Sequence, residues 1–363
     1  MRATALIDEC LSSPLHAARI EHARGRRVVG YIGDDIPVEL ILAADALPVR
    51  LTGVPAPTPL ADRYLESSFA PAHRSLLEAW LQGAFDFMDA IVFPRSSDSA
   101  QRLYYYVCEL QRRGIHAGPR SLIYDVARVN RATSHAHTVA ATYALAADLN
   151  VDPSRLDAAV ARVRNRASLI VTLAELRTGS LAIAGSEALR AWRALQLDWT
   201  DDFERAVREW TASAHRQHCS PRLLFAGSTP PDERFHLAIE AVGGAIVDEL
   251  YDESPASSAA RWTARGASLE DIARRYRSAR TTDVALLETP DLLLDRARGA
   301  DASGVLLWLS EQDEGIVWEV PRQLERLRRA GIPVLALTRQ RWDADATCLA
   351  AIQDFACSLR ESS

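Results

Sequence analysis

Short apolar runs, each followed by a turn and then a helical pattern, constrain the fold of this chain more than any other feature. Residues 27–32 form a β-branched run, and Pro37 follows at the start of a predicted helix. Similar runs predict strands at 49–51, 90–93, 121–124, 221–227, 245–248, 305–309 and 331–337. Strands that alternate with helices across short breaks are typical of parallel sheets. The sequence therefore predicts the α/β class, with two Rossmann-like, doubly wound parallel-sheet lobes.

The two sets of predicted strands are separated by a long stretch of helical pattern. This stretch covers residues 133–218 and contains no convincing strand. We therefore expect an N-terminal α/β lobe at 1–132, a helical connecting region at 133–218 and a C-terminal α/β lobe at 219–363.

Charge and composition exclude several classes of function. The formal net charge is −6, which argues against nucleic-acid binding. Every basic residue is an arginine, so a lysine Schiff base and a P-loop are both excluded. The longest apolar runs are too short to cross a bilayer, and the N-terminal residues become acidic early. We therefore expect a cytoplasmic protein without a membrane partner.

The cysteine and histidine spacings do not predict a metal site. The five cysteines are widely separated and form no Cys-x-x-Cys pair, so reduced thiols are expected. His135-x-His137 and His215-x-x-His218-Cys219 have spacings that a zinc ion could use, but no further ligands accompany them. We therefore predict that no metal is bound.

Four segments, in their order along the chain, carry a resemblance to a known family. They are 30–51, which reads as strand, helix and strand; 182–187, a helix break; 221–245, the start of the second lobe; and 331–335, the closing strand. Together they resemble the 2-hydroxyacyl-CoA dehydratase and benzoyl-CoA reductase subunits. The resemblance covers nearly the whole chain and implies an acyl-CoA ligand.

The family resemblance also implies a [4Fe–4S] cluster held by three cysteines, and this chain departs from that pattern. Ala70, Ser97 and Asp313 occupy the three aligned positions. Cluster iron is held by thiolate sulfur, and these three side chains do not provide it. The family's radical chemistry depends on that cluster, so we predict no iron–sulfur cluster and no prosthetic group here.

Polar residues beside these positions are the candidate site. We predict that Ser97, Asp98 and Asp313 are catalytic: Ser97 would bond a thioester carbonyl, and the two aspartates would act as acid or base. Asp98 could instead cap the helix that follows it, and Asp313 could be a solvated loop residue. The predicted substrate-binding residues are Arg74, Arg95, Glu39 and Ala70.

The leading functional hypothesis is a cluster-free subunit of a heteromeric acyl-CoA-processing complex, an acyl-CoA lyase-type enzyme. Its partners would be a CoA thioester and a homologous, cluster-bearing subunit. The first alternative is an independent hydratase, lyase or carbon–carbon bond enzyme that uses acid–base residues in an interlobe cleft. The second is a non-catalytic assembly or binding protein.

The missing cysteines lead to a direct test. Anaerobic incubation with iron and sulfide should leave the protein colourless, because the aligned positions offer no thiolate set. Visible absorption and iron analysis would measure this. A stable brown species containing four irons per chain would contradict the interpretation of all three positions.

Overall fold

The computed structural model describes residues 2–180, 183–214, 219–263, 266–278, 285, 286, 289 and 291–361. The chain divides into two compact units. The first unit contains Met1–Ser168, Arg193–Ala206 and Ala260–Ala279, and the second contains Leu169–Trp192, Val207–Ala259 and Arg280–Ser363. These interleaved units differ from the predicted segments 1–132, 133–218 and 219–363, which remain a prediction.

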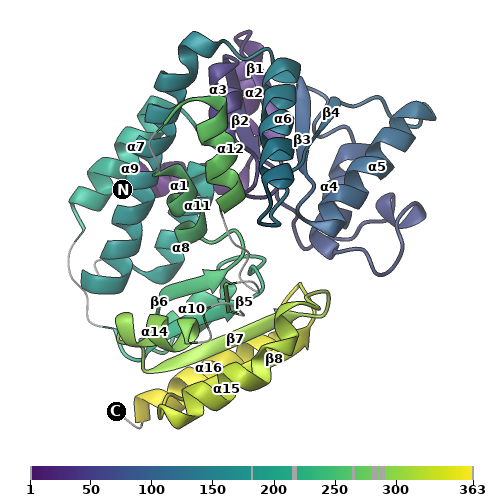
Figure 1. Ribbon diagram of the computed structural model, residues 1–363. Coiled ribbons are helices and arrows are strands. Elements are labelled where there is room, and N and C mark those ends of the chain that lie inside the picture. Colours follow the sequence, from purple (N-terminus) through teal and green to yellow (C-terminus); the bar gives the residue numbers. More distant parts are fainter. Residues whose placement is uncertain are drawn as a thin grey trace. The chain divides into compact units, whose positions relative to one another are not determined.

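Each unit is built on a four-stranded parallel sheet (Figure 1). Sheet A has the order β2-β1-β3-β4, with β1 (Arg27–Tyr31), β2 (Ala46–Arg50), β3 (Ala90–Pro94) and β4 (Arg120–Tyr124). Sheet B has the order β6-β5-β7-β8, with β5 (Arg222–Gly227), β6 (Ala245–Tyr251), β7 (Gly304–Ser310) and β8 (Val334–Gln340). The predicted α/β class with two doubly wound parallel-sheet lobes is confirmed.

The helices and short turns follow in chain order. The earlier helices are α1 (Arg2–Ser12), α2 (His16–Ala23), α3 (Val38–Ala43), α4 (Pro71–Leu81), α5 (Asp98–Arg112), α6 (Ala132–Leu149), α7 (Leu156–Glu175), α8 (Gly185–Leu195) and α9 (Asp201–Ala212). The later helices are α10 (Arg234–Glu240), α11 (Pro255–Trp262), α12 (Leu269–Ser278), α14 (Leu292–Gly299), α15 (Val320–Arg329) and α16 (Ala346–Glu361). The short turns are η1 (Ala61–Arg63), η2 (Pro153–Arg155), η3 (Leu176–Ser180) and η4 (Ile316–Trp318). Within the described residues, no helix combines the length and the apolar character that a membrane span requires.

Sheet A is covered by helices on both faces. Ile91 and Phe93 of β3 point toward α4 and α5, with which they line a common apolar space. Tyr124 of β4 points to the opposite face, because Phe93 pairs with its neighbour Ile123 and side chains alternate along a strand. There its hydroxyl lies 2.9 Å from Thr142 of α6.

Sheet B separates two apolar cores by the same alternation. Leu223 and Phe225 of β5 pack with α10 and α16 on one face. Leu224 and Ala226 pack with α14 and α15 on the other. These four side chains are fully buried, as expected for a central parallel strand.

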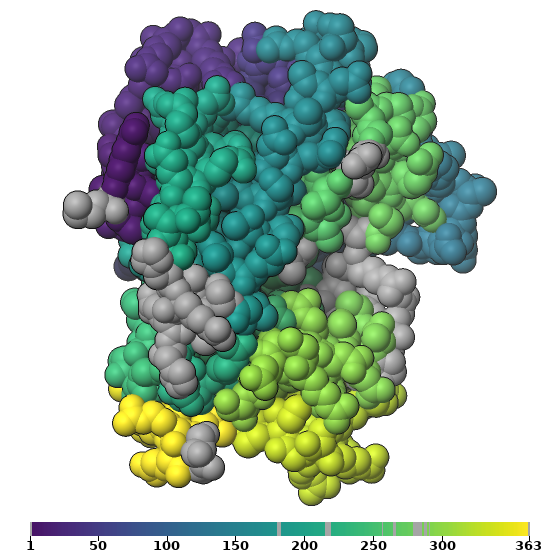
Figure 2. Space-filling model, turned by 90° about the vertical axis from the view of Figure 1, so that its left-hand side faces the viewer, coloured from purple at the N-terminus to yellow at the C-terminus, as the bar shows by residue number. Residues whose placement is uncertain are grey.

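The segment 260–278 is part of the first unit although it follows β6 in sequence. Its helix α12 lies beside α6, as Figures 1 and 2 both illustrate. On α12, Arg275 and the Tyr276 hydroxyl donate hydrogen bonds of 2.6 and 2.9 Å to the two carboxylate oxygens of Glu39 on α3. All three side chains are buried. Burial and the neighbouring Glu39 charge raise the pKa of Tyr276, so its hydroxyl remains a donor.

A second buried ion pair stabilises the second unit. Glu249 of β6 accepts hydrogen bonds from Arg177 of η3 and from His236 of α10. Burial raises the pKa of Glu249, but the Arg177 charge and the His236 hydrogen bond outweigh burial and lower it to about 2. The carboxylate therefore stays ionised, and it joins three elements of this unit.

Removing one partner of this pair should be costly. Arg177→Met leaves the buried Glu249 without its main counter-charge, and we expect a loss of about 3–5 kcal/mol in the free energy of unfolding. Arg274→Met is the control, since Arg274 is exposed and its ion pair among the described residues is with Asp271, one helical turn away. Urea unfolding followed by circular dichroism measures both. Equal midpoints for the two variants would contradict a structural role for the pair.

A histidine in the first turn of α4 should make stability depend on pH. Burial lowers the pKa of His73 to about 4, from 6.5 in an unfolded chain. The unfolded chain therefore binds a proton more tightly, and stability should fall as the pH decreases from about 6.5 to about 4. His73→Gln should flatten this part of the curve of melting temperature against pH. The exposed His16→Gln is the control, and an unchanged slope in His73→Gln would contradict the assignment.

Candidate functional site

Several charged side chains lie beside the carboxyl ends of the strands of sheet A. The chain leaves β1 toward β2 and leaves β3 toward β4, so the connections diverge between β1 and β3. Ligands of doubly wound sheets bind at such a point. Four of the predicted site residues lie next to the starts or ends of elements. Arg95 follows β3, Ser97 precedes α5, and Ala70 and Arg74 lie at the start of α4.

Ser97, rather than Asp98, caps α5. The Ser97 backbone is extended, and its hydroxyl accepts a hydrogen bond of 3.4 Å from the Ala100 N–H. Asp98 is the first residue of the helix, and its exposed carboxylate lies 3.7 Å from Arg102. The suggestion that Asp98 is the cap is therefore wrong, because the helix begins at Asp98 itself, one residue earlier than that suggestion required. The predicted catalytic roles of both residues remain predictions.

Ala70 and Arg74 flank the start of α4. Ala70 occupies the cap position with a methyl group, which cannot bond the helix N–H groups. Arg74 donates to Asp62 at 2.6 Å and to the Glu66 carbonyl. The predicted ligand-binding role of Arg74 thus competes with hydrogen bonds that Arg74 makes within the protein.

Arg102 connects the segment before α4 to α5. Its guanidinium donates to Glu66 at 2.8 Å and stacks 4.7 Å from the ring centre of Phe69. Tyr106 of α5 donates to the same carboxylate at 3.0 Å. The residues around the two aligned cysteine positions are therefore held by ordinary hydrogen bonds and stacking.

The described residues do not fit a [4Fe–4S] cluster. Ala70 and Ser97 offer a methyl group and a capping hydroxyl in place of thiolates. Burial raises the pKa of the Cys10 thiol to about 12 and also raises that of Cys108, which disfavours the thiolate form. Within the described part of the chain, no group of three or more histidine, cysteine or acidic side chains could hold a metal ion. His215 and His218 lie outside the described residues.

Three arginines face two aspartates beside the end of β1. Asp34 accepts from Arg50 at 2.6 Å and from Arg261 at 3.1 Å. Asp35 accepts from Arg128 at 2.6 Å and lies 3.5 Å from Arg261. The side chains of this Asp34–Asp35 network are mostly buried, so its charges are screened little by solvent.

Glu39 lies inside the first unit and not at its surface. Its carboxylate is fully buried and bonded to Arg275 and Tyr276 of α12. That position favours a structural role over the predicted contact with substrate. Sequence spacing gave no signal for this pairing, because the partners are more than 200 residues apart.

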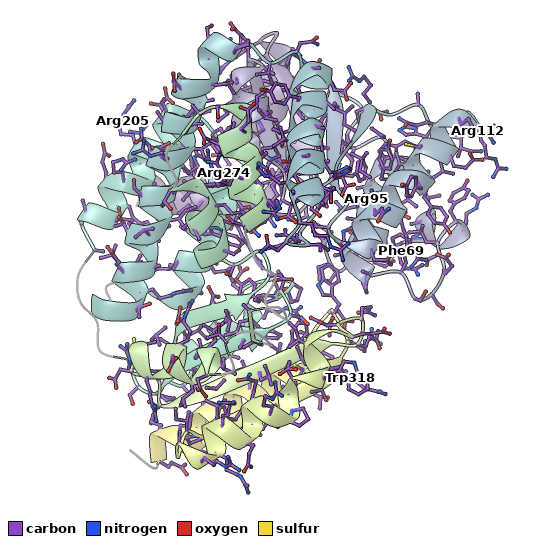
Figure 3. All side chains as sticks on the ribbon, in the orientation of Figure 1. Phe69, Arg95, Arg112, Arg205, Arg274 and Trp318 are labelled. Atoms are coloured by element: carbon purple, nitrogen blue, oxygen red, sulfur yellow. The ribbon has the colours of Figure 1, made fainter. Side chains whose placement is uncertain are left out.

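Arg95 pairs with an acid that the sequence reasoning did not consider. Arg95 and Asp125 directly follow the paired residues Pro94 and Tyr124, and the Arg95 guanidinium bonds Asp125 Oδ2 (Figure 3). His137 Nε2 of α6 lies 2.7 Å from the same oxygen. The sequence feature that could have identified Asp125 is its position directly after a predicted strand.

In the second unit, Asp313 bonds a serine that was also missed. The Ser228 hydroxyl, just beyond β5, donates to Asp313 Oδ2 at 2.8 Å and accepts from the Ser310 N–H at 3.0 Å. Gly227 precedes it at φ 121°, where an added Cβ would lie 2.1 Å from the Trp308 carbonyl oxygen. Further along the loop after β7, Trp318 is 82% exposed (Figure 3). The sequence feature that could have identified Ser228 is its position directly after Gly227, at the end of a predicted strand.

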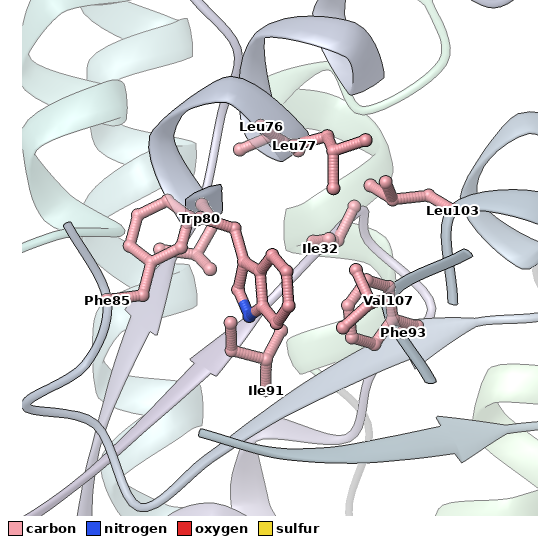
Figure 4. A pocket seen from close by; sticks show the side chains of 10 residues that line it. Ile32, Leu76, Leu77, Trp80, Phe85, Ile91, Phe93, Leu103 and Val107 are labelled. Atoms are coloured by element: carbon pink, nitrogen blue, oxygen red, sulfur yellow. The ribbon is translucent and has the colours of Figure 1, made fainter. Parts of the chain in front are cut away.

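An apolar pocket lies between sheet A and the helices α4 and α5 (Figure 4). Its cavity volume is only about 10 Å³, room for about one water molecule, so it is a gap in the apolar core and not a ligand-sized cavity. Its lining comes from β3, α4, α5 and adjoining loops: Ile32, Leu51, Leu76, Leu77, Trp80, Phe85, Ile91, Phe93, Leu103 and Val107. The indole N–H of Trp80 is the polar group among these side chains, so the pocket has little means to orient a ligand.

Comparisons with known proteins identify the family. Two solved structures, both of the SBP FpvC from Pseudomonas aeruginosa, with Ni²⁺ and with Mn²⁺, are 9% and 12% identical to the chain. They cover 93% of this chain and 98% or 100% of theirs, but TM-scores of 0.22 and 0.20 carry no argument. A comparison with curated proteins gave no match. A model of the 2-hydroxyglutaryl-CoA dehydratase D-component matches residues 35–355, and the chain therefore belongs to the 2-hydroxyacyl-CoA dehydratase family.

Proposed function

We propose that this protein is a cluster-free subunit of a heteromeric acyl-CoA-processing complex and holds a CoA thioester at the carboxyl edge of sheet A. The observation that carries the proposal is the replacement of thiolate at two of the family's cluster positions. Ala70 and Ser97 there precede α4 and α5, whose starts are stabilised by ordinary protein contacts. The family's architecture is thus kept without its redox group, and a partner subunit would supply any electron.

The electrostatics of the same edge support an anionic ligand. The Asp34–Asp35 network carries three guanidinium groups against two carboxylates, all within the first unit. CoA is a polyanion, and arginine forks bind phosphate through paired hydrogen bonds. In a chain that lacks lysine, arginine is the side chain available for that contact.

The alternative of an independent acid–base enzyme is favoured by one observation. Asp125 and His137 form an oriented carboxylate–imidazole pair at the same edge. Such a pair can move protons without any prosthetic group. The remaining alternative, a non-catalytic assembly protein, requires neither the pair nor a bound thioester.

Native mass spectrometry of the protein purified anaerobically from its own host tests the proposal. We expect the chain to appear with a homologous, cysteine-bearing subunit and a CoA thioester. Arg95→Gln should reduce thioester occupancy, since Arg95 lies at the proposed edge. Arg112→Gln is the control, because Arg112 is exposed and pairs only with Glu109 one turn away.

Other outcomes separate the hypotheses. A homo-oligomer that carries a thioester would favour the independent enzyme. A complex without any thioester, together with no measurable affinity for acyl-CoA, would favour the assembly protein and contradict the proposal.

A further inference from the structure

The Asp125–His137 pair is held rigidly at the carboxyl edge of sheet A. Asp125 directly follows β4, and the His137 side chain extends from the second turn of α6. The next residue, Thr138, fixes that turn: its hydroxyl accepts from the Ala127 N–H at 3.1 Å and donates to the Ser134 carbonyl at 3.0 Å. The backbone positions from which the imidazole and the carboxylate extend are therefore fixed relative to each other.

The hydrogen bonds to Asp125 fix the tautomer of His137. An ionised carboxylate only accepts, so the nitrogen that faces it, Nε2, carries the proton. The lone pair of the neutral ring is then on Nδ1. Arg95 donates to the same oxygen of Asp125 and holds that oxygen in place. A carboxylate commonly orients a histidine base through Nδ1 and leaves Nε2 free; here the two nitrogens exchange these places, because Asp125 bonds Nε2.

The accessibility of the ring suits proton exchange with a ligand. The His137 side chain is 50% exposed, whereas its partner Asp125 is 23% exposed. The carboxylate is thus the more enclosed member, and the ring faces outward at the edge where such folds bind ligands. Imidazole exchanges protons near neutral pH more readily than any other side chain.

A second pair of the same chemistry provides an internal comparison. His116 Nε2 lies 2.8 Å from Asp86 Oδ1, but these residues precede β4 and β3. The His116–Asp86 pair is therefore at the amino edge of sheet A, the edge opposite to the one that binds ligands. His116 also packs edge-on against Trp80, with ring centres 4.6 Å apart, which is a structural contact.

We propose that His137, oriented by Asp125, is a general base that removes a proton from the carbon next to the thioester carbonyl of a bound acyl-CoA. This inference rests on the proposed function, because it needs a CoA thioester at the same edge. In the step, the C–H bond breaks, the proton moves to Nδ1 of His137, and the electron pair forms the enolate of the thioester. Reversal returns a proton from Nδ1 to carbon, so no oxidant or reductant is required.

Hydrogen exchange in D₂O measures this step directly. The protein, purified with any subunit that stays bound, is incubated with butyryl-CoA in D₂O. Mass spectrometry of the recovered thioester then measures how much deuterium it has incorporated. Wild-type protein should exchange hydrogen for deuterium at that carbon faster than buffer does. His137→Gln should reduce the rate by about 10²-fold or more, the usual contribution of a positioned base.

Asp125→Asn tests the positioning role. An asparagine amide can donate to Nε2, which would move the ring proton to Nδ1 and remove the base from the proposed side. We therefore expect slow exchange with butyryl-CoA affinity retained. A merely structural role would instead lower affinity and melting temperature together. His116→Gln is the matched control and should exchange at the wild-type rate.

Calorimetric titration with butyryl-CoA separates the two levels of the argument. Binding by wild type without exchange, or equal exchange by wild type and His137→Gln, would overturn the role of His137 alone. No binding by wild type would overturn the proposed function and this inference with it.

Discussion

The buried carboxylate of Glu39 determines which parts of the chain form the first unit. A charge on α3 in the interior needs a counter-charge and further hydrogen bonds, and a hydrophobic neighbour cannot supply them. Both come from α12, through Arg275 and Tyr276. The segment 260–278 is therefore part of the first unit, although it follows β5 and β6 in sequence. This requirement accounts for the part of the interleaving in which Ala260–Ala279 belongs to the first unit.

The same returning segment organises the polar edge. Arg261 of α11 contacts both Asp34 and Asp35, which lie in the loop after β1. Arg50 and Arg128 complete the network from the ends of β2 and β4. Four separate pieces of chain thus meet at one end of sheet A. The positions of their charges are fixed by one another, and the edge is organised before any ligand binds.

Local sequence predicted most of the strands, since most are short apolar runs; β1, β3, β5 and β7 are buried almost throughout, whereas β4 and β8 are only partly buried. Where the predicted bounds of an element differ from those of the structure, the cause is local. The predicted helix at 38–46 ends early because Asp45 takes a φ of 57°, and β2 then begins at Ala46. Pro48 fits that strand because β2 is at the sheet edge, where a missing N–H costs little. In the last strand, Gly331 is used in a turn at φ 72°, so β8 begins at Val334.

The site was less predictable, because its contacts join residues that spacing cannot relate. Ser97 and Asp98 are adjacent polar residues at a strand end, and only the backbone geometry decides which one caps α5. The sequence predicted Glu39 to be a substrate-binding residue, and only its partners on α12 favour a structural role. For the pair Asp125 and His137, pattern could identify a strand end and a helix. It could not show that the second turn of that helix returns to the strand end.

The chemistry of the edge is consistent with the loss of cluster ligands. A [4Fe–4S] cluster needs thiolates, and the cysteines of the first unit, Cys10 and Cys108, lie in surroundings that raise their pKa values. What the edge retains is charge, hydrogen-bond donors and one oriented imidazole. The thioester ligand proposed above would suit this set of groups, because a thioester lowers the cost of forming a carbanion next to its carbonyl. Proton transfer is therefore the chemistry that these residues can support without the family's electron-transfer group.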